Sequence, residues 1–113
     1  MPEQKSEIQY DDFAKLDIRI GSVVAAEAVP DTNKLIKCTL DFGDLGERTI
    51  VSGIAEWKKP EELVGKLLPY IVNLAPKTIR GIESRGMLLA ASDEQGVALL
   101  MPERGLQPGT RLK

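Results

Sequence analysis

The residues best suited to chemistry lie in one stretch, residues 73–91, which reads NLAPKTIRGIESRGMLLAA. It carries three basic side chains, Lys77, Arg80 and Arg85, and a single acid, Glu83, although the formal net charge of the whole chain is -2. Lysine and arginine neutralise phosphate groups, and a local excess of positive charge steers anions toward one place on a surface. The charges alone are also typical of a solvated loop, so the fold around them has to separate the two interpretations.

Small and polar residues in the same stretch also fit an anion site. Gly81 and Gly86 allow the backbone to approach a bulky anion closely. Asn73 and Ser84 can hydrogen-bond a phosphate, a ribose or a splayed base. For two residues of the stretch, a structural role is the alternative to ligand binding. Asn73 can cap the end of a strand, and Met87 fits the apolar core pattern better than a ligand contact.

The composition excludes the common catalytic and metal sites. The 113 residues include no histidine and one cysteine, so neither a Ser-His-Asp nor a Cys-His arrangement can be built, and zinc sites of the usual kinds are excluded. The adjacent acids Asp11 and Asp12 are more typical of the start of a helix than of a catalytic pair. We therefore predict a binding protein with no catalytic residues, no metal site and no cofactor.

The same totals bound the compartment and the domain organisation. A single cysteine permits no intrachain disulfide, which suits a reducing compartment. No stretch approaches the ~20 apolar residues of a membrane-spanning helix, and the polar N-terminus lacks a signal peptide's apolar run. We expect a cytoplasmic protein without a membrane partner, with one domain at residues 10–113 behind a polar tail or linker at residues 1–9. Residues 1–13 fit either a native start or a linker from a longer chain.

The elements that position the basic stretch are mostly strands, because apolar and polar residues alternate along the chain. Gly21 is the expected place for a bulge in the long first strand. An inward position in the second strand predicts that Cys38 is a small core residue. Pro60 with two acids after it, and Gly65 beyond, predicts a short helix. The expected strands are residues 18–29, 36–42, 48–53, 67–73, 87–92 and 97–101.

Three strands, a short helix and two further strands follow the order of the oligonucleotide/oligosaccharide-binding barrel, the OB-fold. We therefore predict an all-β protein, a five-stranded Greek-key barrel of this type with a short helix between strands 3 and 4 and extra strand structure at the C-terminus. Ligands of this fold use the face of strands 2 and 3 and the loops after strands 1 and 4. The basic stretch is the loop between strands 4 and 5, so its charge lies where this barrel binds.

Five segments, in order and spacing, resemble one known family, the tRNA-binding domain appended to or associated with methionyl-tRNA synthetases. Its relatives include stand-alone tRNA-binding proteins, chaperone-like secretion proteins and the endothelial monocyte-activating polypeptide. The segments are FAKLDIRIGSV (13–23), NKLIKCTLDFG (33–43), RTIVSGIA (48–55), PEELVGK (60–66) and VNLAPKTIRGIESRGMLLAA (72–91).

The resemblance implies an OB-fold homodimer that binds the body of tRNA with little sequence preference. It implies a non-catalytic module, the beta subunit or C-terminal domain of methionyl-tRNA synthetase, which raises tRNA affinity and holds two catalytic subunits together. The implied partners are tRNA, a second copy of the chain and the synthetase's catalytic subunit. This chain departs from the family motif at Thr78, where many relatives have a second basic residue. The tRNA-binding residues that the resemblance implies are Lys34, Asn73, Lys77, Arg80, Ser84 and Met87. The charge pattern adds Arg85 to them.

Two other functions fit the sequence. One is a chaperone-like protein that binds unfolded or export-bound polypeptides, which should expose an apolar groove and respond weakly to salt. The other is a purely structural dimerisation domain in which the basic loop is idle. For the dimer, apolar residues outside the core pattern predict an interface at or beside residues 97–101 and the tail around Leu106 and Leu112.

Overall fold

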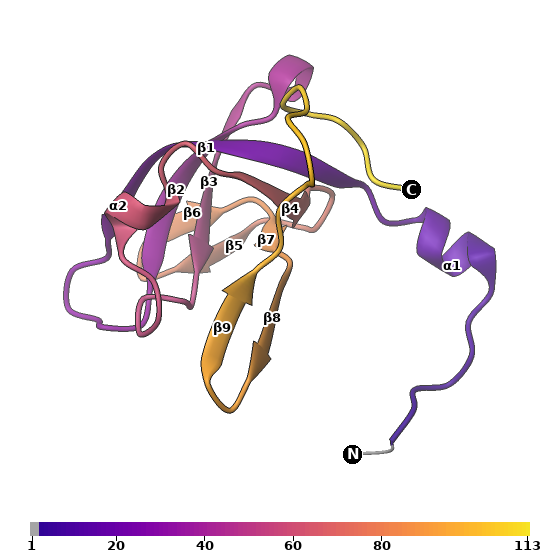
Figure 1. Cartoon of the computed structure of the whole chain (residues 1–113), viewed down its shortest axis with the longest axis horizontal. Helices are drawn as coiled ribbons and strands as arrows, with labels where there is room; N and C mark the ends of the chain where they lie inside the picture. Colours follow the sequence, from indigo (N-terminus) through magenta and orange to yellow (C-terminus); the bar gives the residue numbers. More distant parts are fainter. Residues whose placement is uncertain (1–2) are drawn as a thin grey trace.

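Five antiparallel strands form the centre of the molecule in the computed structural model, which describes residues 3–113 (Figure 1). Their order in the sheet is β3-β2-β1-β4-β7, and the chain returns beside β3 after β4, so the sheet curls into a nearly closed barrel. This confirms the predicted all-β barrel of the OB type. The strands are β1 (Ile18–Ala28), β2 (Ile36–Asp41), β3 (Glu47–Ser52), β4 (Leu67–Ile71) and β7 (Met87–Leu88).

The remaining elements surround or extend this barrel. The predicted short helix between the third and fourth strands is confirmed as α2, while α1 stands apart from the barrel and the hairpin β8–β9 projects from it (Figure 1). None of the helices within residues 3–113 has the length and apolar character needed to cross a membrane. Their bounds are α1 (Tyr10–Ala14), the 3-10 helix η1 (Gly43–Leu45), α2 (Pro60–Leu63), β5 (Lys77–Ile79), β6 (Ile82–Ser84), β8 (Ala90–Asp93) and β9 (Gly96–Leu99).

Alternate residues of the strands fill the barrel with an apolar core. Phe42 and Tyr70 meet edge to face in it, with ring centroids 5.6 Å apart. The prediction for Cys38 is confirmed: the side chain is buried, and burial raises the pKa of its thiol to about 11, because a thiolate is disfavoured away from water. The core also contains Val23, Ile36, Leu40, Ile50, Ile54, Leu63, Leu68 and Val72.

The bulge in the long first strand lies elsewhere than predicted. The register against β2 shifts between Val23 and Ala25, not at Gly21. Gly21 is instead a point of close approach, since a Cβ atom there would lie 2.6 Å from Cε1 of the Phe42 ring. The glycine therefore makes room for the Phe42 ring, which packs on Tyr70 in the core.

Two predictions about the second half of the chain are wrong in detail. The basic stretch is not a plain loop but contains the hairpin β5–β6. The expected strand at residues 87–92 is divided, because only Met87–Leu88 pairs with β4 and Ala90–Asp93 pairs with β9. Leu89 donates its N–H to the carbonyl of Pro69 at 3.0 Å, but proline has no N–H to return, so the ladder with β4 ends there.

The seam of the barrel is closed between β3 and the residues that follow β6. Arg85 donates its backbone N–H to the carbonyl of Thr49 at 2.9 Å. Val51 donates its backbone N–H to the Ser84 hydroxyl, also at 2.9 Å. A side-chain oxygen thus replaces a backbone carbonyl at this point, and the hairpin β5–β6 is held against β3.

Replacing Gly21 by Ala should destabilise the barrel by about 1–3 kcal/mol, because the new methyl group overlaps the Phe42 ring in a packed core. Urea unfolding followed by circular dichroism measures the change. Gly105→Ala is the matched control, since a Cβ atom there meets nothing within 4 Å, and it should stay within about 0.5 kcal/mol of the parent. Equal stabilities for the two variants would contradict the close-approach interpretation.

Candidate nucleic-acid interface

The basic hairpin β5–β6 is closed by a two-residue turn, Arg80 and Gly81. Both adopt positive φ angles, 53° and 78°, which is typical of the tight turns that match the twist of paired strands. Arg80 is an uncommon case of a larger residue in this conformation. The turn places the exposed Arg80 at the tip of the hairpin.

One face of the hairpin borders a cavity of about 480 Å³. Lys77 lies opposite Ser84 in the hairpin register, so both side chains are on the same face. These two residues supply the polar groups of the lining, and the rest of it is apolar. The volume falls within the ~300–1,000 Å³ of small-molecule sites. The other lining residues are Val51, Leu74, Ala75, Ile79, Gly86 and Met87.

The hydroxyl of Ser84 already has a structural task. Ser84 is buried, and its oxygen accepts the Val51 N–H that closes the seam. Its hydroxyl hydrogen is still available for donation, because a serine hydroxyl can accept and donate at once. Ser84 therefore borders the cavity as a fixed wall, and its contact with tRNA stays a prediction.

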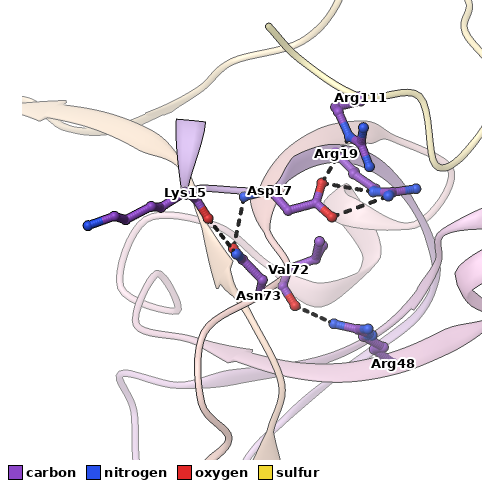
Figure 2. A network of polar contacts seen from close by, with 7 residues as sticks. All are labelled: Lys15, Asp17, Arg19, Arg48, Val72, Asn73 and Arg111. Carbon is purple, nitrogen blue, oxygen red and sulfur yellow. Dashed lines mark hydrogen bonds and ion pairs between the residues drawn. The ribbon is translucent and has the colours of Figure 1, made fainter. Parts of the chain in front are cut away.

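Asn73 is not among the residues that line this cavity, and its side chain points toward Lys15 and Asp17, in the connection between α1 and β1 (Figure 2). Its Oδ1 accepts the backbone N–H of Asp17 at 2.8 Å, and its Nδ2 donates to the carbonyl of Lys15 at 2.7 Å. Asn73 thus ties the end of β4 to a segment 56 residues away, instead of capping its own strand. Its direct contact with tRNA also stays a prediction.

The other predicted residues, Met87, Arg85 and Lys34, lie in three different places. Met87 lies at the cavity with 46% of its surface exposed, so the core interpretation is wrong. Arg85 is exposed beside β3. Lys34 is exposed on the β1–β2 connection, and no hydrogen bond or ion pair within residues 3–113 links it to the hairpin. The structure therefore brings Lys77, Ser84 and Met87 together at the cavity, and Lys34 is not among the residues that line it.

A polar network that sequence reasoning missed lies next to Asn73, around Asp17 (Figure 2). Arg19 donates to the Asp17 carboxylate through Nε at 2.9 Å and Nη2 at 3.2 Å, and Arg111 donates through Nε at 3.3 Å. The bonds from Arg19 are the main cause that lowers the pKa of Asp17, and burial opposes them. Close by, Arg48 donates to the carbonyl of Val72. No local pattern signals this network, because Asp17 and Arg111 are 94 residues apart.

Comparison with known proteins identifies a family for this arrangement. Residues 18–111 match the model of the putative tRNA binding domain family. The methionine–tRNA ligase of Archaeoglobus fulgidus is 54% identical over 110 residues, and that of Bacteroides fragilis is 49% identical over 110 residues. The alignments cover 97% and 96% of this chain but only 17% and 16% of those proteins. The chain thus corresponds to about a sixth of these ligases.

Two solved structures match almost the whole chain. The MetRS related protein from Pyrococcus horikoshii has a TM-score of 0.90 at 43% identity, over 96% of this chain and 100% of that one. The chaperone CsaA from Bacillus anthracis has a TM-score of 0.87 at 33% identity, over the same two shares. The fold therefore occurs both in a synthetase-related protein and in a chaperone.

Replacing Ser84 by Ala should destabilise the protein by about 1–3 kcal/mol, because it leaves the Val51 N–H without its acceptor at the seam. Thermal unfolding measured by circular dichroism reports the loss. Ser92→Ala changes an exposed serine on β8 and should unfold like the parent. A Ser84→Ala protein with parental stability would show that the hydroxyl is not needed for closure.

Proposed function

Because the chain belongs to the putative tRNA binding domain family, we propose that it is a non-catalytic module that binds tRNA through the hairpin β5–β6. The main support is the position of Lys77 and Arg80. Both are exposed on one tight hairpin, and neither forms an ion pair within residues 3–113. Cations without acidic partners are available for phosphates, which give affinity without sequence information.

The cavity beside the hairpin supports a second kind of contact. Its apolar walls, from Leu74, Ile79 and Met87, can hold the flat face of an unpaired base, while Lys77 at the lining attracts the adjoining phosphate. Ser84 can donate its hydroxyl hydrogen to the edge of that base. Phosphate contacts and one accommodated base favour a structured RNA with splayed nucleotides over a continuous single strand.

The synthetase relatives support a role beside a catalytic subunit. About a sixth of each ligase corresponds to this chain, so the module acts either as the C-terminal domain of methionyl-tRNA synthetase or as its separate beta subunit. In both arrangements it raises the affinity for tRNA, and the catalytic subunit binds methionine and ATP. We expect a module with this task to act in the cytoplasm, with residues 10–113 as its domain.

Apolar surfaces at the C-terminal side support self-association. A groove of about 330 Å³ runs between β4 and the tail, and Leu100 and Met101 on it are 50% and 56% exposed. The groove also includes Leu106 and Leu112, as the sequence predicted for an interface. A second copy that covers the groove would form a two-fold dimer.

A chaperone-like function is the alternative, favoured by the structural similarity to CsaA and by the apolar groove and cavity. Polypeptide binding in such sites depends on buried apolar area, so it should respond weakly to salt. RNA binding depends on counterion release and should weaken steeply as salt rises. The salt dependence of binding therefore separates the two functions.

Replacing Lys77 and Arg80 by Ala should weaken tRNA binding about equally for different tRNAs. The slope of log affinity against log salt should become shallower by ~0.9 per lost contact, or about 1.8 for the two residues. Filter binding at several salt concentrations measures the slope. Lys58→Ala with Lys59→Ala removes two charges from the segment before α2 and should leave the slope unchanged. An unaltered slope in the hairpin variant would reject the proposal and favour the chaperone function.

For the dimer, light scattering at micromolar concentration should give twice the mass of one chain. Leu100→Asp with Met101→Asp should yield the monomer, because charges on a covered apolar groove oppose association. Val24→Asp, at an apolar residue on β1 that is 48% exposed, should stay dimeric. A parent protein that scatters as a monomer would rule out the dimer.

A further inference from the structure

Four arginines lie toward one end of the barrel, two of them bonded to the carboxylate of Asp17. We define the arginine cluster as Arg19, Arg48, Arg85 and Arg111. Arg19 and Arg111 share the carboxylate of Asp17, while neither Arg48 nor Arg85 forms an ion pair within the described part of the chain. The positive charge at this end is therefore only partly neutralised.

The strand register explains how Arg48 comes to lie at the mouth of the barrel. Arg48 is paired with Leu40 across β2 and β3, and paired residues point to the same side of a sheet. Since Leu40 is a core residue, Arg48 points toward the barrel interior from the end of β3. Its guanidinium donates through Nη1 to the carbonyl of Val72, the residue after β4 (Figure 2).

This fixed guanidinium is well suited to an anion. Within residues 3–113 only one of its five N–H donors bonds to protein, and the bond to Val72 holds the fork in place. Burial lowers the pKa of Arg48, and repulsion from Arg85 and then Arg19 lowers it further, against an opposing effect of Asp17. An anion at this end would relieve the repulsion. Ligands commonly bind at the mouths of barrels of this kind.

Arg85 makes the cluster continuous with the hairpin. It follows β6 directly, and its backbone N–H bonds to Thr49, the residue after Arg48. A path of positive charge therefore leads from Arg80 at the hairpin tip, past Lys77 and Arg85, to the barrel mouth. A polyanion such as an RNA backbone can contact several of these charges at once.

We propose that the arginine cluster is a second anion site, which binds phosphodiester groups of the RNA backbone between Arg48, Arg85 and Arg111. The proposal rests on the proposed function for the identity of the polyanion. In it, the hairpin and the barrel mouth hold successive phosphates of one RNA, and Asp17 orients Arg19 and Arg111 without neutralising the whole cluster. A purely structural role for Arg48, as a plug of the barrel end, predicts no effect of Arg85 or Arg111 on binding.

The test uses Arg85→Ala with Arg111→Ala, because the side chain of Arg85 forms no hydrogen bond within residues 3–113 and Arg111 is largely exposed. With unfractionated tRNA, the salt slope should become shallower by about 1.8, from two lost contacts at ~0.9 each. Combined with the hairpin variant, the two reductions should add. Arg104→Ala is the matched control, since it lies near Gly65 and Leu67 at the other end of β4. Circular dichroism checks that each variant is folded.

The outcomes separate this proposal from the proposed function. A parental slope in the cluster variant, with a shallower slope in the hairpin variant, overturns the second site and leaves the proposed function intact. If the parent protein does not bind tRNA, the proposed function fails, and tripolyphosphate decides on the cluster by itself. It should then raise the melting temperature of the parent and of the hairpin variant but not of the cluster variant. Equal rises in all three proteins overturn the second site.

Discussion

The closure of the barrel at the seam is the constraint on which both proposed binding regions depend. Arg85 and Ser84 join the chain to β3 through the carbonyl of Thr49 and the N–H of Val51. Without these bonds β3 would present an open edge, which natural sheets avoid. The same two bonds hold the hairpin against the barrel and place the side chain of Arg85 beside Arg48. Closure and the path of positive charge are thus produced by the same residues.

Gly86 makes this junction possible. Its φ angle is +144°, and a Cβ atom there would lie 2.7 Å from Cδ1 of Ile50 and 2.9 Å from the carbonyl oxygen of Ile71. The chain therefore passes between β3 and β4 in a conformation and a space that suit only glycine. Immediately afterwards, Met87 begins pairing with β4 and borders the cavity. The apolar run follows the basic stretch directly because the hairpin must return to the barrel within one residue.

The sequence predicted the barrel because the two-residue alternation of a strand is a local signal, and it predicted the short helix because proline and acids mark a helix start. The hairpin was missed since its strands have three residues each, too few for a pattern, and since Arg80 occupies a turn position usually taken by glycine or asparagine. The tie from Asn73 spans 56 residues and the Asp17–Arg111 contact 94. Such contacts depend on the closed topology, which no neighbouring residues encode.

Alternation also sorts charge from apolar surface at the C-terminal side. On β1, Arg19 turns to Asp17 at the barrel end while the next residue, Ile20, lines the apolar groove. In the tail, which bridges to Arg19 through Arg111, Leu112 enters the same groove. Successive residues of a strand point to opposite sides, so Arg19 and Ile20 serve different surfaces of β1. In the tail, Arg111 borders the groove and also bonds to Asp17, so the groove and the arginine cluster meet at this residue. The two proposed surfaces are therefore adjacent, and the tail that completes the groove also carries one arginine of the cluster.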